Sequence, residues 1–228
     1  MKYLKVLLFG IFAGLAIGLG SFAFTVATSF AVDEQGKVVS EWLMTGSALF
    51  SIGLILVCVL GLQLYTGKIG VVFDNREKLK ENAINLPIML VGNAIGAFAL
   101  GIFCHFIFMN VPEIAARIVK IADAKIASPH VFVEGILCGA LVYIAVYLYK
   151  NLQNWGMKII GIITAVTLFV YCGFQHCIAN MFYFGMAFNW NINMLWNLLI
   201  VILTNSVGAL LVRCIVHLTA VIATKKEN

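Results

Sequence analysis

Six apolar runs dominate this sequence, and each is long enough to cross a lipid bilayer. A spanning helix needs about 20 mostly apolar residues, because the bilayer core holds no water to satisfy the backbone. Hydrophobic residues make up 62% of the chain and charged residues 11%, against about 25% charged in soluble domains. The sequence therefore predicts an all-α polytopic membrane protein with six transmembrane helices in a single domain, residues 1–228. The runs cover approximately residues 4–32, 43–73, 83–109, 130–149, 156–188 and 192–222.

The second and fifth runs are longer than one straight helix requires, and both contain a glycine–glutamine segment near the middle. Gly61–Gln63 matches Gly173–Gln175 at an offset of 112 residues. Gly92–Ala97 matches Thr204–Ala209 at the same offset. Two separate motifs at one offset indicate an internal repeat in which the second and fifth helices are broken.

The repeat predicts two copies of opposite orientation, because each copy holds three spans and three is odd. We expect the copies over about 1–109 and 125–222. The pair Gly14 and Gly18 resembles Gly135 and Gly139 at a different offset, 121 residues. Between the copies, isoleucines recur at helical spacing, which predicts a short amphipathic connecting helix over about 111–124.

Lysine and arginine counts in the connections predict the orientation. With both termini in the cytoplasm, ten basic residues lie inside and four outside, which is the usual bias. The inside set is Lys2, Lys5, Lys68, Arg76, Lys78, Lys80, Lys150, Lys158, Lys225 and Lys226. The outside set is Lys37, Arg117, Lys120 and Lys125. The net charge of +5 therefore indicates topology and not a nucleic-acid partner.

The ionisable side chain of His176 lies in the middle of the fifth run, in the segment Gly173–Asn180. Placing such a group at bilayer depth costs roughly 2.5 kcal/mol or more, which makes it a candidate functional residue rather than a hydrogen-bonded core histidine. Thr66 adds a hydroxyl just after the other break. Asn180 follows His176 by one helical turn and is placed to hold its ring or tautomer. Breaks at membrane depth need protein or a water-filled cavity around them, so we expect the two breaks to meet at a central cavity.

The polar residues of the spans favour anions or small neutral acids over metal cations. No acidic residue stands beside His176, and Glu134 lies only near the outer end of the fourth run. The amides at the start of each half-helix carry partial positive charge. The cysteines are scattered and form no CxxC pair. We therefore expect no cofactor, no metal and no enzyme activity.

Several of these segments resemble the formate/nitrite transporter family. Gly173–Phe182 looks like its fifth-span signature, normally Gly-Phe-Glu-His followed by Ala-Asn-Met, and Leu64–Gly67 looks like its second-span loop, normally Leu-Phe-Thr-Gly. The repeated Gly/Thr-Asn-x-x-Gly elements of the third and sixth runs also match. Within the family the chain looks closest to the hydrosulfide-channel subgroup. It departs from the pattern at Gln175 and Gln63, where the family has acids, and at Lys68.

The resemblance implies a homopentamer in the inner membrane of a bacterial cell, with an aquaporin-like protomer and one pore in each. Carried over by position, the pore has apolar constrictions, a polar centre and a lysine that draws anions towards it. The constriction residues are Phe50, Leu54, Leu64 and Phe169; the polar centre is His176, Thr66 and Asn180; the lysine is Lys125.

The predicted function is a channel for small monovalent anions or their conjugate acids, with hydrosulfide ranked first, then formate and nitrite. Whether His176 exchanges a proton during transit or only donates a hydrogen bond stays open. An aquaporin-like channel for small neutral solutes is the alternative. A membrane enzyme or metal-binding subunit would need clustered ligands that the sequence does not offer.

Overall fold

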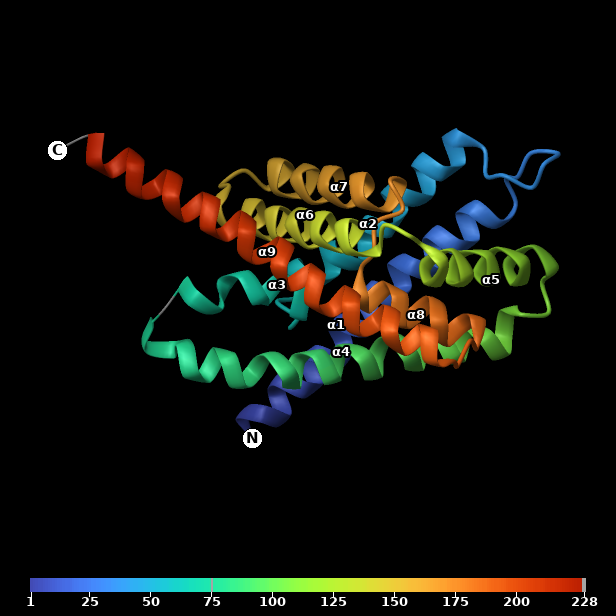
Figure 1. Cartoon of the computed structure of the whole chain (residues 1–228), viewed down its shortest axis with the longest axis horizontal. Coiled ribbons are helices and arrows are strands. Elements are labelled where there is room, and N and C mark those ends of the chain that lie inside the picture. The colour runs from blue at the N-terminus through green and yellow to red at the C-terminus, as the bar shows by residue number, and fades with distance from the viewer. Residues whose placement is uncertain (75, 227–228) are drawn as a thin grey trace.

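The computed structural model is all-helical (Figure 1) and describes residues 1–74 and 76–226. The side chains of residues 74–76 and 224–228 lie outside this description, and with them Arg76, Lys225 and Lys226 of the orientation argument. The described α-helices are α1 (Lys2–Ser29), α2 (Ser40–Val59), α3 (Tyr65–Lys68), α4 (Leu79–Phe108), α5 (Pro112–Ala127), α6 (Val131–Asn151), α7 (Trp155–Tyr171), α8 (Cys177–Ala187) and α9 (Ile192–Lys226). Two 3-10 helices, η1 (Ile69–Asp74) and η2 (Arg76–Lys78), join α3 to α4.

Five of the described helices, α1, α2, α4, α6 and α9, are long and apolar enough to cross a membrane by length and composition. The fifth predicted run is divided between two shorter apolar helices, α7 with 17 residues and α8 with 11. The second predicted run is divided among α2, α3 and η1. The chain thus leaves helical geometry inside both long runs, at the glycine–glutamine segments.

The two breaks have the same local structure at an offset of 112 residues. α2 ends at Val59 and α7 at Tyr171, while α3 begins at Tyr65 and α8 at Cys177. Within each break one glycine has a positive φ, 66° at Gly61 and 72° at Gly173, a conformation that residues with a Cβ rarely adopt. The glycines therefore end the first half-helices and turn the chain towards the second ones.

A buried asparagine holds each break in place. At the first break, the Asn93 amide donates to the Gly10 and Gln63 carbonyls, both at 2.8 Å, and its Oδ1 accepts from Tyr65 N. At the second, the Asn205 amide donates to the Gly135 and Gln175 carbonyls, both at 2.8 Å. Its Oδ1 accepts from Cys177 N at 3.0 Å. Both asparagines are fully buried, so they satisfy backbone groups that water cannot reach.

The glycine contacts correct one predicted match. A Cβ on Gly14 would run into the Asn93 carbonyl oxygen, and a Cβ on Gly139 into that of Asn205. By these contacts Gly14 corresponds to Gly139, 125 residues away, and the match of Gly14 with Gly135 at an offset of 121 is wrong by one helical turn. A repeated small-xxx-small face allows two registers, and only the partner's contacts distinguish them.

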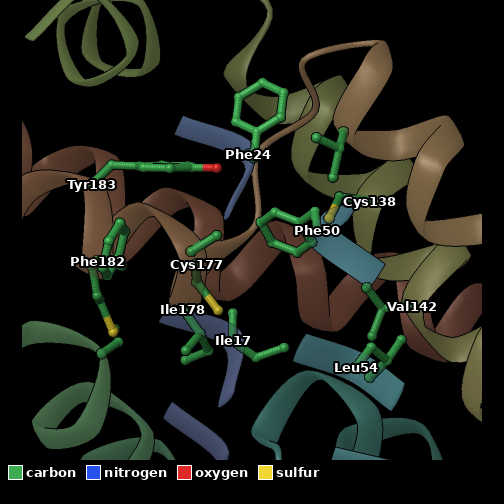
Figure 2. Close-up of a cluster of buried hydrophobic side chains, with 14 of the residues drawn as sticks. Ile17, Phe24, Phe50, Leu54, Cys138, Val142, Cys177, Ile178, Phe182 and Tyr183 are labelled. Atoms are coloured by element: carbon green, nitrogen blue, oxygen red, sulfur yellow. The ribbon is translucent and has the colours of Figure 1, made fainter. Parts of the chain in front are cut away.

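The helices pack in two similar groups, with α1 against α2 and α4, and α6 against α7 and α9. α8 lies against α4 of the other group, and α2 against α7. Side chains from α1, α2, α6 and α8 form one buried cluster, where Figure 2 shows Phe50 and Leu54 near Cys138 and Val142. Large apolar side chains such as Phe106 and Leu203 stay exposed, as expected where lipid is the solvent.

α5 covers most of the predicted amphipathic connection. Its buried face is Ile114, Ile118, Ile121 and Ala122, and the helix packs against α8 and α1. In Figure 1 the C-terminal part of α9 reaches one end of the long axis, and α5 lies at the other. The connection therefore covers the end of the bundle remote from that part of α9.

Candidate functional site

His176 is the last residue of the second break and the N-cap of α8. Its Nδ1 accepts a hydrogen bond from Ala179 N at 3.2 Å. The ring is buried, with 2% of its surface exposed. A ring nitrogen that accepts carries no proton, so the neutral ring has its proton on Nε2. The helix start thereby fixes both the tautomer and the orientation of the imidazole.

Thr66 meets this ring from the other break. Its Oγ1 lies 3.0 Å from His176 Nε2, and its side chain is fully buried in α3. With the tautomer above, Nε2 donates to the hydroxyl, which leaves the Thr66 proton for another acceptor. The structure thus joins the two breaks through the pair that the sequence predicts as a polar centre.

Asn180 lies beside the pair but does not hold the ring. Its amide donates to Gln175 Oε1 at 2.7 Å and to Asn197 Oδ1 at 2.9 Å. The predicted hold on the His176 ring is wrong, because Ala179 N occupies the only ring nitrogen free to accept. Among the residues that the structure describes, Asn180 Oδ1 finds no hydrogen-bond partner although it is buried. This atom is a free acceptor at the centre of the site.

The four predicted constriction residues are all buried, between 1% and 3% exposed, and come from both long runs. Phe50 and Phe169 meet edge to face, with ring centroids 5.7 Å apart. Phe169 also stacks on the His176 ring at 5.9 Å. Leu54 lies one helical turn after Phe50, and Leu64 occupies the position of the first break that His176 has in the second. The polar pair therefore borders an apolar layer.

A cavity of about 500 Å³ opens at the α5 end and reaches His176, Gln175 and Asn180. Its charged lining is Arg117, Lys120, Lys125 and Glu134. Three cations and one carboxylate give this outer cavity a positive balance, which attracts anions.

Lys125, in the last turn of α5, lies at the edge of the outer cavity and bonds to the second break. Its Nζ donates to the Gly173 and Phe174 carbonyls, both at 2.8 Å. Burial lowers the pKa of Lys125 to about 8, and the charge of Glu134 opposes that shift. Lys125 therefore supports the turn of the second break, while its role in drawing anions towards the pore stays a prediction.

A smaller cavity of about 140 Å³ lies at the opposite end of α6 and is lined by Leu64, Lys68 and Lys150. Thr66, Phe50 and Leu54 line neither this inner cavity nor the outer one. The two cavities therefore approach the centre from opposite ends, and the buried side chains of Thr66, Phe50 and Leu54 lie between them.

The sequence analysis missed part of the site. Gln175 connects to Glu134, Asn180 and the Lys125 carbonyl, and Asn197 also donates to that carbonyl at 2.8 Å. Gln175 stood out in the sequence only as a departure from a family pattern, and Asn197 belongs to none of the motifs, so the sequence does not show which atoms these side chains bond. Among residues 1–74 and 76–226 no group of three or more His, Cys, Asp or Glu side chains is placed to hold a metal.

Known proteins resemble this chain in sequence and in structure. The uncharacterized transporter YrhG of Bacillus subtilis is 33% identical over 195 residues, 77% of this chain and 73% of that protein. The formate channel FocB of Escherichia coli is 28% identical over 188 residues, 78% of this chain and 64% of its own length, so the match spans less than two thirds of FocB. A solved structure, a pentameric formate channel with formate bound, has the same fold, with a TM-score of 0.74 at 24% identity over 99% of this chain and 96% of that one.

The family match decides the chain's class. Residues 1–219 match the family described as Formate/nitrite transporter. Several apolar helices together with this match indicate a multi-pass membrane protein with a transport role rather than an enzyme. The chain belongs to the formate/nitrite transporter family.

Proposed function

We propose that this protein is a membrane channel for small monovalent anions or their conjugate acids. The contact between Thr66 and His176 carries the proposal, because it places two hydrogen-bonding groups where two helix breaks meet. Buried polar groups at such depth are costly and are retained where they serve a pathway. Formate channels among the relatives support an anion as the substrate.

The residues divide the passage into three steps. Lys125, with Arg117 and Lys120, raises the local concentration of anions in the outer cavity. The phenylalanine and leucine layer removes water and excludes hydrated cations, which keep their shells. At the centre, the Thr66 hydroxyl proton is the donor that compensates the lost water.

The capping bond bears on the role of His176. A second proton on the ring would have to sit on Nδ1, which already accepts from Ala179 N. Protonating the ring therefore breaks a bond at the start of α8. We infer that His176 acts in its neutral form and donates through Nε2, and that passage as a neutral acid takes its proton from water in the cavities.

The architecture we propose has six spans in two inverted copies, about 1–109 and 125–222, with both termini in the cytoplasm of a bacterial cell. The matched breaks and the matched asparagines support the repeat. The pentameric formate channel supports a homopentamer, and an aquaporin-like protomer with a pore in each is what the sequence resemblance implies.

The candidate substrates are hydrosulfide, formate and nitrite. The names of the relatives favour formate. The resemblance to the hydrosulfide subgroup is the reason to test hydrosulfide first.

The test is flux into proteoliposomes with each of the three anions and with chloride, across pH. We expect His176→Ala to reduce flux of the preferred anion about tenfold, the cost of about 1.4 kcal/mol for one lost donor. His217→Ala, at an exposed position on α9, is the matched control. An unchanged substrate ranking and pH profile in His176→Ala would contradict the proposal. Flux independent of membrane potential would favour the neutral-solute alternative.

A further inference from the structure

The outer cavity contains one carboxylate among its charged side chains, and that carboxylate is held in place. Glu134 Oε1 accepts from Ser128 Oγ at 2.8 Å, and Oε2 accepts from Gln175 Nε2 at 3.0 Å. Both oxygens are therefore oriented by neighbours. A side chain fixed at both oxygens keeps its charge at a defined point of the cavity.

Gln175 connects this carboxylate to the lysine and to the polar centre. Its Nε2 also reaches the Lys125 carbonyl at 3.1 Å, and its Oε1 accepts from Asn180. The Lys125 ammonium bonds to the carbonyls of the two residues before Gln175. Glu134 and Lys125 thus contact the same short turn. Glu134 bonds the side chain of Gln175, which is uncharged, and Lys125 bonds the backbone carbonyls just before it.

We propose that Glu134 is a specificity-determining residue that sets how tightly the outer cavity holds an anion. Its charge offsets that of Lys125 next to the pathway. A conducting site must bind strongly enough to attract an ion and weakly enough to release it. Arg117, Lys120 and Lys125 provide the attraction, and Glu134 limits it. The proposal rests on the proposed function, since it concerns anion passage.

The contact between Gln175 and Glu134 permits a charge-swap experiment. Gln175→Glu adds a carboxylate one hydrogen bond away from the existing one, and Glu134→Gln removes that one. The double variant keeps the net charge and moves the carboxylate from position 134 to position 175, across the 3.0 Å contact. The Asn180 amide still finds an acceptor at position 175, and Ser128 still finds one at position 134.

Initial flux of formate against its concentration is the first measurement. We expect Glu134→Gln to lower the half-saturating concentration and the maximal rate, each about threefold. The reason is that one negative charge in the lining of a partly solvated cavity changes anion binding severalfold. Gln175→Glu should raise the half-saturating concentration by a similar factor. The double variant should return to within a factor of about two of the wild type. Glu34→Gln, an exposed carboxylate outside the cavity, is the charge-matched control.

The second measurement does not depend on transport. The pH midpoint at which a small amine-reactive reagent modifies Lys125 reports its protonation in the purified protein. The titratable or charged groups around it are Arg117, Lys120, Glu134, Cys138, Tyr171, Cys172, His176 and Tyr183. Glu134→Gln should lower the midpoint by about one unit, Gln175→Glu should raise it, and the double variant should restore it.

The outcomes separate two failures. If the wild type carries no anion while the Lys125 midpoints shift as stated, the proposed function fails and the charge pairing stands as an electrostatic fact without a transport role. If the wild type carries formate and both single variants shift the half-saturating concentration in the same direction, with no recovery in the double variant, Glu134 is only structural and the inference is overturned. Unchanged kinetics in Glu134→Gln would overturn it equally.

Discussion

At the first break the chain passes from Val59 through Leu64 into a helix of 4 residues; at the second it passes from Tyr171 through His176 into a helix of 11. The glycine with positive φ and the clamping asparagine occupy equivalent places in both. The residue before each half-helix differs, as leucine on one side and histidine on the other. A glycine and an asparagine therefore give both breaks the same backbone geometry, while the residue before the half-helix, Leu64 or His176, differs.

The surroundings differ in the same sense. The second break is bonded by Lys125 and borders a cavity of about 500 Å³ with several charges. Leu64 of the first break borders a cavity of about 140 Å³. A shared backbone with unlike side chains thus puts a leucine on one side of the centre and a histidine on the other, and basic side chains line the cavity on each side.

The largest expected effect tests the asparagines that hold the backbone of both breaks. Asn93→Leu and Asn205→Leu each remove three hydrogen bonds to buried backbone groups. Each orphaned group costs about 1–3 kcal/mol, so we expect a loss of at least about 3 kcal/mol in the free energy of unfolding for either variant. Thermal unfolding in detergent should show this as a fall of roughly 6–12 °C in the melting temperature.

Asn151→Leu is the control, since Asn151 is exposed and bonds a carbonyl of its own helix. It should unfold near the wild-type temperature. A large loss in only one of the two clamp variants would contradict the structural equivalence of the breaks.

Much of the fold was predictable from sequence because apolar length and glycine–glutamine segments act locally. The boundaries of both breaks fall at the offset of 112 residues that the motifs indicated. Which glycine of α1 corresponds to which glycine of α6 in the repeat was not predictable, because Gly10, Gly14 and Gly18 allow two equivalent alignments. The contacts of Asn93 and Asn205, far away in sequence, decide between them.

The site was partly predictable for a related reason. His176 and Thr66 stand out by their cost in an apolar run, and the structure places them 3.0 Å apart. The suggested bond from Asn180 to the His176 ring was wrong, since helical spacing shows which residues are close but not which atom is already bonded. Glu134 was placed only near the outer end of the fourth run, because nothing in the sequence shows that Gln175 reaches it.

The turn glycines give a smaller test of the same equivalence. A Cβ at Gly61 or Gly173 meets nothing within 4 Å, so Gly→Ala there changes only backbone strain. At a φ near 70° we expect each variant to lose about 1 kcal/mol and roughly 2–4 °C in melting temperature. Gly36→Ala, in an open loop with φ of 71°, calibrates the cost outside the breaks. Unequal losses at Gly61 and Gly173 would show that one turn is constrained by more than its own conformation.

The smallest expected effect concerns the lysine that distinguishes the second break. Lys125 has a pKa of about 8, lowered by burial, so it is charged below that pH and neutral above it. Formate stays ionised throughout this range, because carboxyl groups have pKa values near 4. Formate influx into proteoliposomes should therefore fall about threefold as pH rises from about 7 to 9, with the same pH on both sides. Formate influx through Lys125→Arg should not change with pH in this range, because a guanidinium remains charged. Influx through Lys125→Gln should not change either, and should stay near the wild-type rate at high pH.

The arginine and glutamine variants separate Lys125 from other titrating groups. If the wild type and Lys125→Arg decline in parallel, the titrating group lies elsewhere, and the outer cavity does not owe its anion preference to this lysine. The effect should also shrink at high salt, since mobile ions screen a charge at the mouth of an open cavity over a Debye length of about 3 Å at 1 M. A decline insensitive to salt would instead point to the bonds from Lys125 to the Gly173 and Phe174 carbonyls. In that case the protonated lysine acts by holding the turn in shape, and the difference between the two breaks is mechanical before it is electrostatic.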